Sequence, residues 1–192
     1  MRADSLEAAT AALKRAATQA PWEPNPHLQL VQLYKDLQRP KEAQKEQQLF
    51  DKSFALEEKA KSLQRAIEAF PNSARPRSDL ATVYGRQGRL QEALKYFQQA
   101  VEIDPQHGAT HMGMGTVLFR LRRFDEAIRA YEQACRVQPD LANAYKDLGH
   151  AYAARGRLQE AIQTWQTLLR KVPDHPQARR WISQAQKKLE AR

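Results

Sequence analysis

A repeat with a period of 34 residues is the strongest constraint on how this chain folds. Three consecutive stretches, 74–107, 108–141 and 142–175, align without a gap. Three kinds of residue recur at this spacing, namely prolines, alanines and aromatic residues: Pro105, Pro139 and Pro173; Ala93, Ala127 and Ala161; Phe97, Tyr131 and Trp165. A proline ends a helix, and a single helix pair cannot bury its apolar face alone. The period therefore predicts helix pairs that stack into a solenoid.

Local features within each unit agree with a helix–turn–helix. The first helix carries an apolar residue followed by a small one, which lets a second helix approach closely: Leu80–Ala81, Met114–Gly115 and Leu148–Gly149. The chain has 30 Ala against 6 Val and 5 Ile, which excludes a strand-based fold. Over residues 74–175 the pattern resembles the tetratricopeptide repeat family. The resemblance implies an all-α, right-handed α-solenoid whose first helices line a concave, peptide-binding face.

The repeat register continues outside the regular units, but its spacing changes. We expect a single domain over residues 1–192, with an orphan helix over 4–20 and an irregular repeat over 24–73. The three regular repeats follow. Residues 176–192 carry apolar residues on one side and charge on the other, which predicts a C-terminal capping helix.

The irregular repeat is 16 residues longer than one period, and the extra residues fall in 41–70. This segment contains neither Gly nor Pro, so we expect one long helix of about 45 Å. A break near Asp51–Ser53 is the alternative. In a continuous helix Phe50 should be buried against the preceding helix. Phe54 or Leu56 should be exposed in the middle, as a second site for a partner or for self-association.

Residues with catalytic or metal-binding chemistry are scarce. The single cysteine, Cys135, excludes an internal disulfide and a multi-thiolate metal site, and we interpret it as a core residue. His107 and His111 have a helical metal-ligand spacing, but Gly108 and a unit boundary lie between them. No glycine-rich phosphate loop is present. We therefore expect no enzymatic activity, no cofactor and no metal.

Charge and hydropathy limit the partners. The net charge is +9, with an excess of basic residues in 155–192 that we interpret as a solubilising cap. Nucleic acid is not an expected partner, because Trp181 is the one candidate for stacking on bases. No apolar run reaches the ~20 residues of a membrane span. The first twenty residues are not a signal peptide, so a cytoplasmic location is expected if this is the full chain.

The resemblance places candidate binding residues on the concave face, at first-helix positions that the core does not use. They are Arg86, Met112, Thr116, Phe119, Arg120, Lys146, His150, Arg180 and Trp181. An apolar Met and an exposed Phe among basic residues fit a peptide or protein partner with apolar and acidic residues. A clamp for a C-terminal carboxylate is not expected, because Asn143 alone is of a suitable type and Asp147 would repel a carboxylate.

The function expected from these features is that of a non-catalytic scaffold or adaptor for protein partners. The alternative is a docking or regulatory region of a larger protein, since the chain starts in the second half of a unit. Residues 165–179 also resemble the last repeat of bacterial cytochrome-biogenesis and respiratory-assembly proteins. The oligomeric state does not follow from the sequence.

Overall fold

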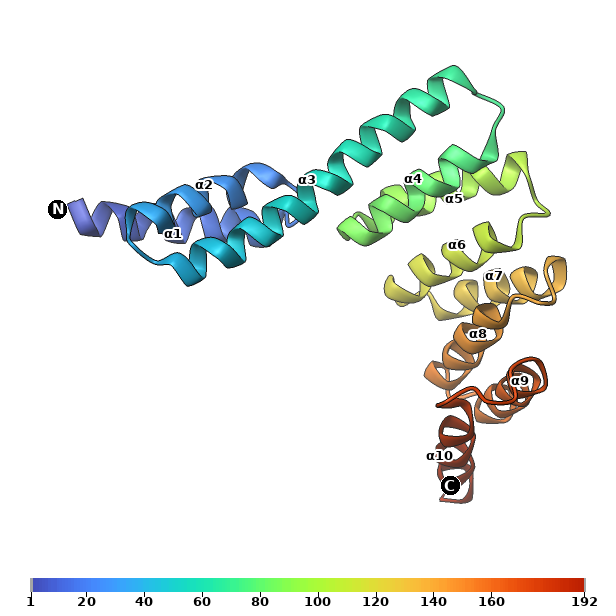
Figure 1. Cartoon of the computed structure of the whole chain (residues 1–192). Coiled ribbons are helices and arrows are strands. Elements are labelled where there is room, and N and C mark those ends of the chain that lie inside the picture. Colours follow the sequence, from blue (N-terminus) through green and yellow to red (C-terminus); the bar gives the residue numbers. More distant parts are fainter. Residues whose placement is uncertain (1, 192) are drawn as a thin grey trace.

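The computed structural model describes the backbone of residues 2–191 and the side chains of residues 6–191. This range contains ten α-helices and no β-strand, which confirms the all-α solenoid (Figure 1). The expected single domain also includes residues 1 and 192, which lie outside the described range. In chain order the helices are α1 (Arg2–Gln19), α2 (Pro24–Asp36), α3 (Pro40–Ala69), α4 (Ala74–Gln87), α5 (Leu90–Ile103), α6 (Gly108–Arg120), α7 (Phe124–Val137), α8 (Ala142–Ala154), α9 (Leu158–Lys171) and α10 (Ala178–Glu190).

The three regular repeats form the helix pairs α4–α5, α6–α7 and α8–α9, and α10 packs on α9. Each second helix is covered by the first helix of the next unit: α5 by α6, α7 by α8 and α9 by α10. The first helices α4, α6 and α8 also contact one another in turn and form one layer. A continuous apolar core, the main core, runs from Ala60 in α3 to Ala185 in α10.

Within each unit, the small residue of the first helix lies opposite the aromatic residue of the second. A Cβ on Gly115 would lie 2.8 Å from the ring of Tyr131, and one on Gly149 would lie 2.2 Å from Nε1 of Trp165. The first regular unit has Ala81 and the smaller ring of Phe97 at the same repeat positions. The larger ring therefore occurs with the smaller partner, which keeps the two helices close in all three units.

The first helices end at a residue with a left-handed backbone. Gly88 and Gly156 have φ of 86° and 74° at this position, and Gln38 and Arg122 have φ of 54° and 61°. Glycine adopts this conformation without penalty, whereas a residue with a Cβ is strained by about 1–2 kcal/mol. The turn geometry is thus kept even in the two units that lack the glycine.

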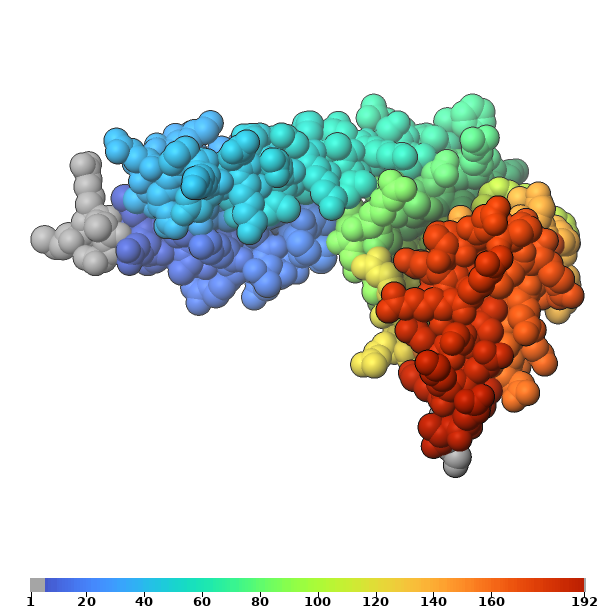
Figure 2. All heavy atoms as spheres, turned by 60° about the horizontal axis from the view of Figure 1, so that its bottom comes forward, coloured from blue at the N-terminus to red at the C-terminus, as the bar shows by residue number. Residues whose placement is uncertain are grey.

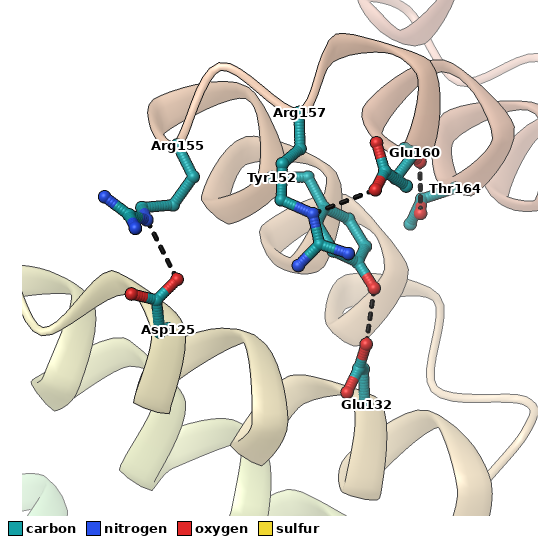
Figure 3. Close-up of polar contacts among 7 residues, drawn as sticks. All are labelled: Asp125, Glu132, Tyr152, Arg155, Arg157, Glu160 and Thr164. Atoms are coloured by element: carbon teal, nitrogen blue, oxygen red, sulfur yellow. Dashed lines mark hydrogen bonds and ion pairs between the residues drawn. The ribbon is translucent and has the colours of Figure 1, made fainter.

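Each second helix starts with an arginine that pairs with a glutamate three residues later: Arg39–Glu42, Arg89–Glu92, Arg123–Glu126 and Arg157–Glu160. Figure 3 shows how this contact links units at the α7–α8 junction. Arg157 lies 4.6 Å from the ring centre of Tyr152, whose hydroxyl donates a hydrogen bond to Glu132 of the preceding unit. Arg155 donates to Asp125 at 2.8 Å. Exposed ion pairs contribute ~0–1 kcal/mol each, so these contacts orient the units more than they stabilise them.

The N-terminal helices form an arm that projects from the regular repeats (Figures 1 and 2). α1 and α2 pack on each other and on the first half of α3, around a small core of Leu30, Tyr34 and Ala43. α3 is one unbroken helix of 30 residues, as its lack of Gly and Pro predicts. Its second half packs on α4, where Gln64 donates a hydrogen bond to the Tyr84 hydroxyl at 2.9 Å.

The aromatic residues in the middle of α3 differ partly from expectation. Phe50 is half-buried rather than buried, and its ring stacks on Phe54 at a centroid distance of 5.6 Å. Phe54 is 48 % exposed, as predicted. Leu56 is half-buried against the main core and so is not the exposed residue. The burial of Phe50 fails because α3 continues where a regular unit would turn back and cover that position.

Candidate functional site

An open cavity of about 410 Å³ lies on the layer of first helices. α6 contributes Thr116, Phe119 and Arg120 to its lining, and α8 contributes His150. We call this the groove cavity. It brings together four of the nine residues predicted from the sequence. Two further lining residues come from α7 and α8: Tyr131 and Asp147.

The apolar wall of the groove cavity is more rigid than predicted. Phe119 is half-buried, not exposed, because it packs on the main core and meets Phe124 edge-on at a centroid distance of 5.2 Å. Met112 is also half-buried against the main core and is not part of the cavity lining. Phe119 therefore presents a fixed ring edge to a ligand, rather than a freely rotating side chain.

A short hydrogen-bond chain forms the floor of the cavity. The Tyr131 hydroxyl donates to Oγ1 of Thr116 at 3.2 Å, and this hydroxyl donates to the Met112 carbonyl at 3.1 Å. Burial raises the pKa of Tyr131 well above its ordinary value, so the phenol is neutral at physiological pH. Tyr131 was interpreted from sequence as a core residue. Its hydroxyl, which Phe97 lacks at the same repeat position, was the signal that it needs a polar partner.

The charges in and beside the cavity are mixed. The Arg120 guanidinium donates to the Gly85 carbonyl on α4, which holds this side chain over the junction of α4 and α6. Lys146 forms an ion pair with the neighbouring Asp147 at 3.3 Å, so its charge is largely compensated. Arg86 is exposed on α4 and does not line the cavity. Positive charge therefore concentrates on the α4–α6 side, and Asp147 supplies negative charge on the α8 side.

An aromatic cluster closes the C-terminal end of the groove cavity. The His150 ring lies 5.3 Å from Trp165 and 4.4 Å from Trp181, measured between ring centres. His175 also lies against Trp181, at 5.2 Å. Burial lowers the pKa of His150 below its ordinary value, so this ring is neutral at pH 7. Trp181 is half-buried in these contacts, whereas Arg180 is exposed on α10, and neither lines the cavity.

The remaining candidate reactive residues have structural partners. Burial raises the pKa of the Cys135 thiol to about 12, so the thiolate is scarce at neutral pH. His107 Nδ1 lies 2.6 Å from the Thr110 hydroxyl, and His111 Nε2 lies 2.9 Å from the Pro105 carbonyl. Within the described range, no three His, Cys, Asp or Glu residues cluster as metal ligands would. None of the helices described is both long and apolar enough to span a bilayer.

The solenoid with its layer of first helices defines a repeat protein, and sequence models identify which kind. One tetratricopeptide repeat model matches residues 45–106 and 73–140, and a second matches 112–176 and 146–186. The chain therefore belongs to the tetratricopeptide repeat family. No curated protein matches the sequence.

Solved structures of other tetratricopeptide proteins share the fold. YrrB is 19 % identical with a TM-score of 0.63, over 94 % of this chain and 85 % of its own. MamA is 22 % identical with a TM-score of 0.54, over 90 % of this chain and 91 % of its own. The first repeat domain of Spaghetti (RPAP3), bound to the HSP90 peptide SRMEEVD, is 22 % identical with a TM-score of 0.58, over 62 % of this chain and 96 % of its own. At these identities the likeness establishes the fold alone.

Proposed function

We propose that this chain is a non-catalytic scaffold that holds a peptide segment of a partner protein in the groove cavity. The observation that carries the proposal is the open 410 Å³ cavity on the layer of first helices. It combines an aromatic wall, a neutral polar floor and one arginine. Peptide binding by solenoids of this fold supports the proposal: domains of RPAP3 hold HSP90 and HSP70 peptides, and YrrB is described as having an unusual peptide-binding site.

The lining indicates which peptide fits. An apolar side chain would lie between Phe119 and His150, where it displaces water from two ring surfaces. Acidic residues beside this anchor would lie toward α4 and α6, near Arg86 and Arg120, because Asp147 repels them from α8. The preferred sequence thus has a direction: its acidic residues lie on one side of the anchor.

The peptide is expected to be recognised by its side chains rather than by a C-terminal carboxylate. Ser78, at a position where family members can bind that group, is buried and accepts a hydrogen bond from Thr110 at 3.0 Å. Asp147, at another such position, carries the wrong charge. The free acid and the C-terminal amide of SRMEEVD should therefore bind equally.

Fluorescence anisotropy with a labelled peptide tests the proposal. The acidic peptide for this test is an amidated helix former of Leu, Ala and Glu, as long as α4, which has 14 residues. Phe119→Ala should weaken its binding by about 2 kcal/mol, because the anchor loses its wall. Asp147→Asn should strengthen it, and Arg120→Gln should slow association in low salt only.

Phe70→Ala is the matched control, since Phe70 is 66 % exposed at the end of α3 and outside the groove cavity. Its affinity for the acidic peptide should equal that of the unmodified chain. An unchanged affinity of the Phe119→Ala variant would refute the assignment of the cavity. Unfolding of that variant would show that Phe119 serves the core instead, and the Asp147→Asn measurement then decides whether the cavity is the site.

A further inference from the structure

A second and larger cavity, of about 650 Å³, lies outside the groove where the N-terminal arm meets the regular repeats. We call it the elbow cleft. In Figure 1 the turn between α1 and α2 faces the turn between α4 and α5 across the middle of α3. The apolar lining comes from Trp22 and Leu28 beside the first turn, and from Phe50 and Phe54 on α3.

The repeat register explains why this surface is uncovered. Phe50 stands at the position of Ala100, Ala134 and Leu168 in the regular units. Those three residues are buried, on second helices that the first helix of the following unit covers. At Phe50 the chain continues along α3 and forms no new first helix, so the position that a helix normally covers faces the elbow cleft.

The exposed apolar residues of the elbow cleft are unusually large for a surface. Phe54 is 48 % exposed and Leu28 is 47 % exposed, and both line the same cavity. Phe50 and Phe54 stack on each other, so their rings form one continuous surface along α3. Contiguous exposed apolar surface of this kind marks interaction sites.

The charges of the cleft lining favour a basic partner. Lys61 is paired with Glu58 at 2.9 Å, and Arg89 is paired with Glu92 at 2.8 Å, so both positive charges are compensated. Among residues 6–191, neither Glu23 nor Glu57 forms an ion pair, although both line the cleft. In a chain of net charge +9, this is a local site of negative charge.

We propose that the elbow cleft binds an amphipathic helix of a partner protein, in the place of the missing first helix. The apolar face of that helix would cover Phe50, Phe54 and Leu28, and its Lys or Arg residues would lie toward Glu23 and Glu57. The cleft is thus a second binding site whose charge preference is opposite to that of the groove cavity. It does not depend on the groove being a peptide site.

A basic peptide tests this proposal on the full chain. It has the sequence of the acidic peptide with every Glu replaced by Lys, and its binding is measured by anisotropy. Because the net charge of +9 repels a cationic peptide, capture requires a local acidic site. The chain should bind it, Phe54→Ala should weaken binding at least tenfold, and Phe70→Ala should leave it unchanged. Both are exposed phenylalanines of α3, or just after it, so both variants should fold normally.

Charge variants separate the cleft from unspecific attraction. The double variant Glu23→Gln, Glu57→Gln should weaken binding of the basic peptide several-fold at low salt and little at high salt. Glu68→Gln, on the same helix but outside the cleft, is the control. Equal loss in the control and the double variant would overturn the charge assignment.

Four further results would overturn the proposal. The first is no binding of the basic peptide to the unmodified chain. The second is equal affinity with and without Phe54→Ala. The third is loss of binding in Phe119→Ala instead, which would place the basic peptide in the groove cavity. The fourth is a dimer in sedimentation velocity that Phe54→Ala dissociates, which would make a second copy of the chain the occupant. Failure of the acidic peptide to bind would refute only the groove.

Discussion

Gly149 lies directly against the indole ring of Trp165, and replacing it by alanine should measurably destabilise the chain. The new Cβ would lie 2.2 Å from Nε1 and 2.5 Å from Cδ1 of that ring, well inside contact distance. Trp165 is buried and donates a hydrogen bond from Nε1 to the Lys146 carbonyl at 3.3 Å, so the ring cannot simply move away. Overpacking of this kind costs about 1–3 kcal/mol.

Gly85→Ala is the matched control, because it makes the same substitution inside another first helix. There the Cβ would lie 3.6 Å from Cγ2 of Val117, which is an ordinary contact. Alanine is favoured over glycine in a helix interior by about 1 kcal/mol, and this gain applies to both variants. The difference between them therefore isolates the overpacking of Trp165, and we expect Gly149→Ala to be less stable than Gly85→Ala by about 2 kcal/mol.

Urea unfolding followed by circular dichroism measures this difference. In a Trp165→Phe background the penalty of Gly149→Ala should shrink, because the first regular unit already combines alanine with phenylalanine, as Ala81 and Phe97. If Gly149→Ala and Gly85→Ala shifted the midpoint equally, the close approach of α8 and α9 would not be tight, and the reasoning would fail.

Three further outcomes follow from the packing and the charges. Ala127→Leu should lower stability by ~1–3 kcal/mol, because Ala127 is fully buried at a helix crossing; an unchanged melting temperature would contradict this. Burial lowers the pKa of His150, so the unfolded chain binds a proton near pH 6.5 before the folded chain does, and stability should fall as pH drops from 6.5 to that lowered pKa. Urea midpoints at pH 7.5 and 5.5 check this, and His150→Gln should reduce the difference. Amides of residues 50–58 should exchange as slowly as the flanking turns of α3, whereas rapid exchange there would show a break.

The regular part of the fold followed from the sequence because its spacing is strict. Ala93, Ala127 and Ala161 recur every 34 residues, and each is fully buried at the crossing of its helix pair. The continuity of α3 followed from the absence of Gly and Pro. The half-burial of Phe50 did not, because the repeat register shows which face is apolar but not that the covering helix is missing.

The details of the groove were less accessible from sequence. Phe119 looked exposed because the repeat core does not use its position, yet it pairs with Phe124 across the turn, where the other regular units have Leu90 and Leu158. Lys146 looked available for a ligand, since adjacent residues on a helix do not face each other. Its long side chain nevertheless reaches Asp147. Such contacts depend on side-chain conformations that a repeat pattern does not specify.

The single-helix connection through α3 gives the molecule the mechanics of a lever. α1 and α2 pack on the first half of α3, so force applied to them reaches the rest of the chain along one helix axis. A bend of about 10° in the middle of α3 would displace its far end, roughly 22 Å away at 1.5 Å per residue, by about 4 Å. The fulcrum lies at Phe50 and Phe54, so the same bend would open or narrow the elbow cleft. A load on the arm and the width of the cleft are therefore mechanically coupled, and tension along α1 would change how tightly the cleft grips whatever it holds.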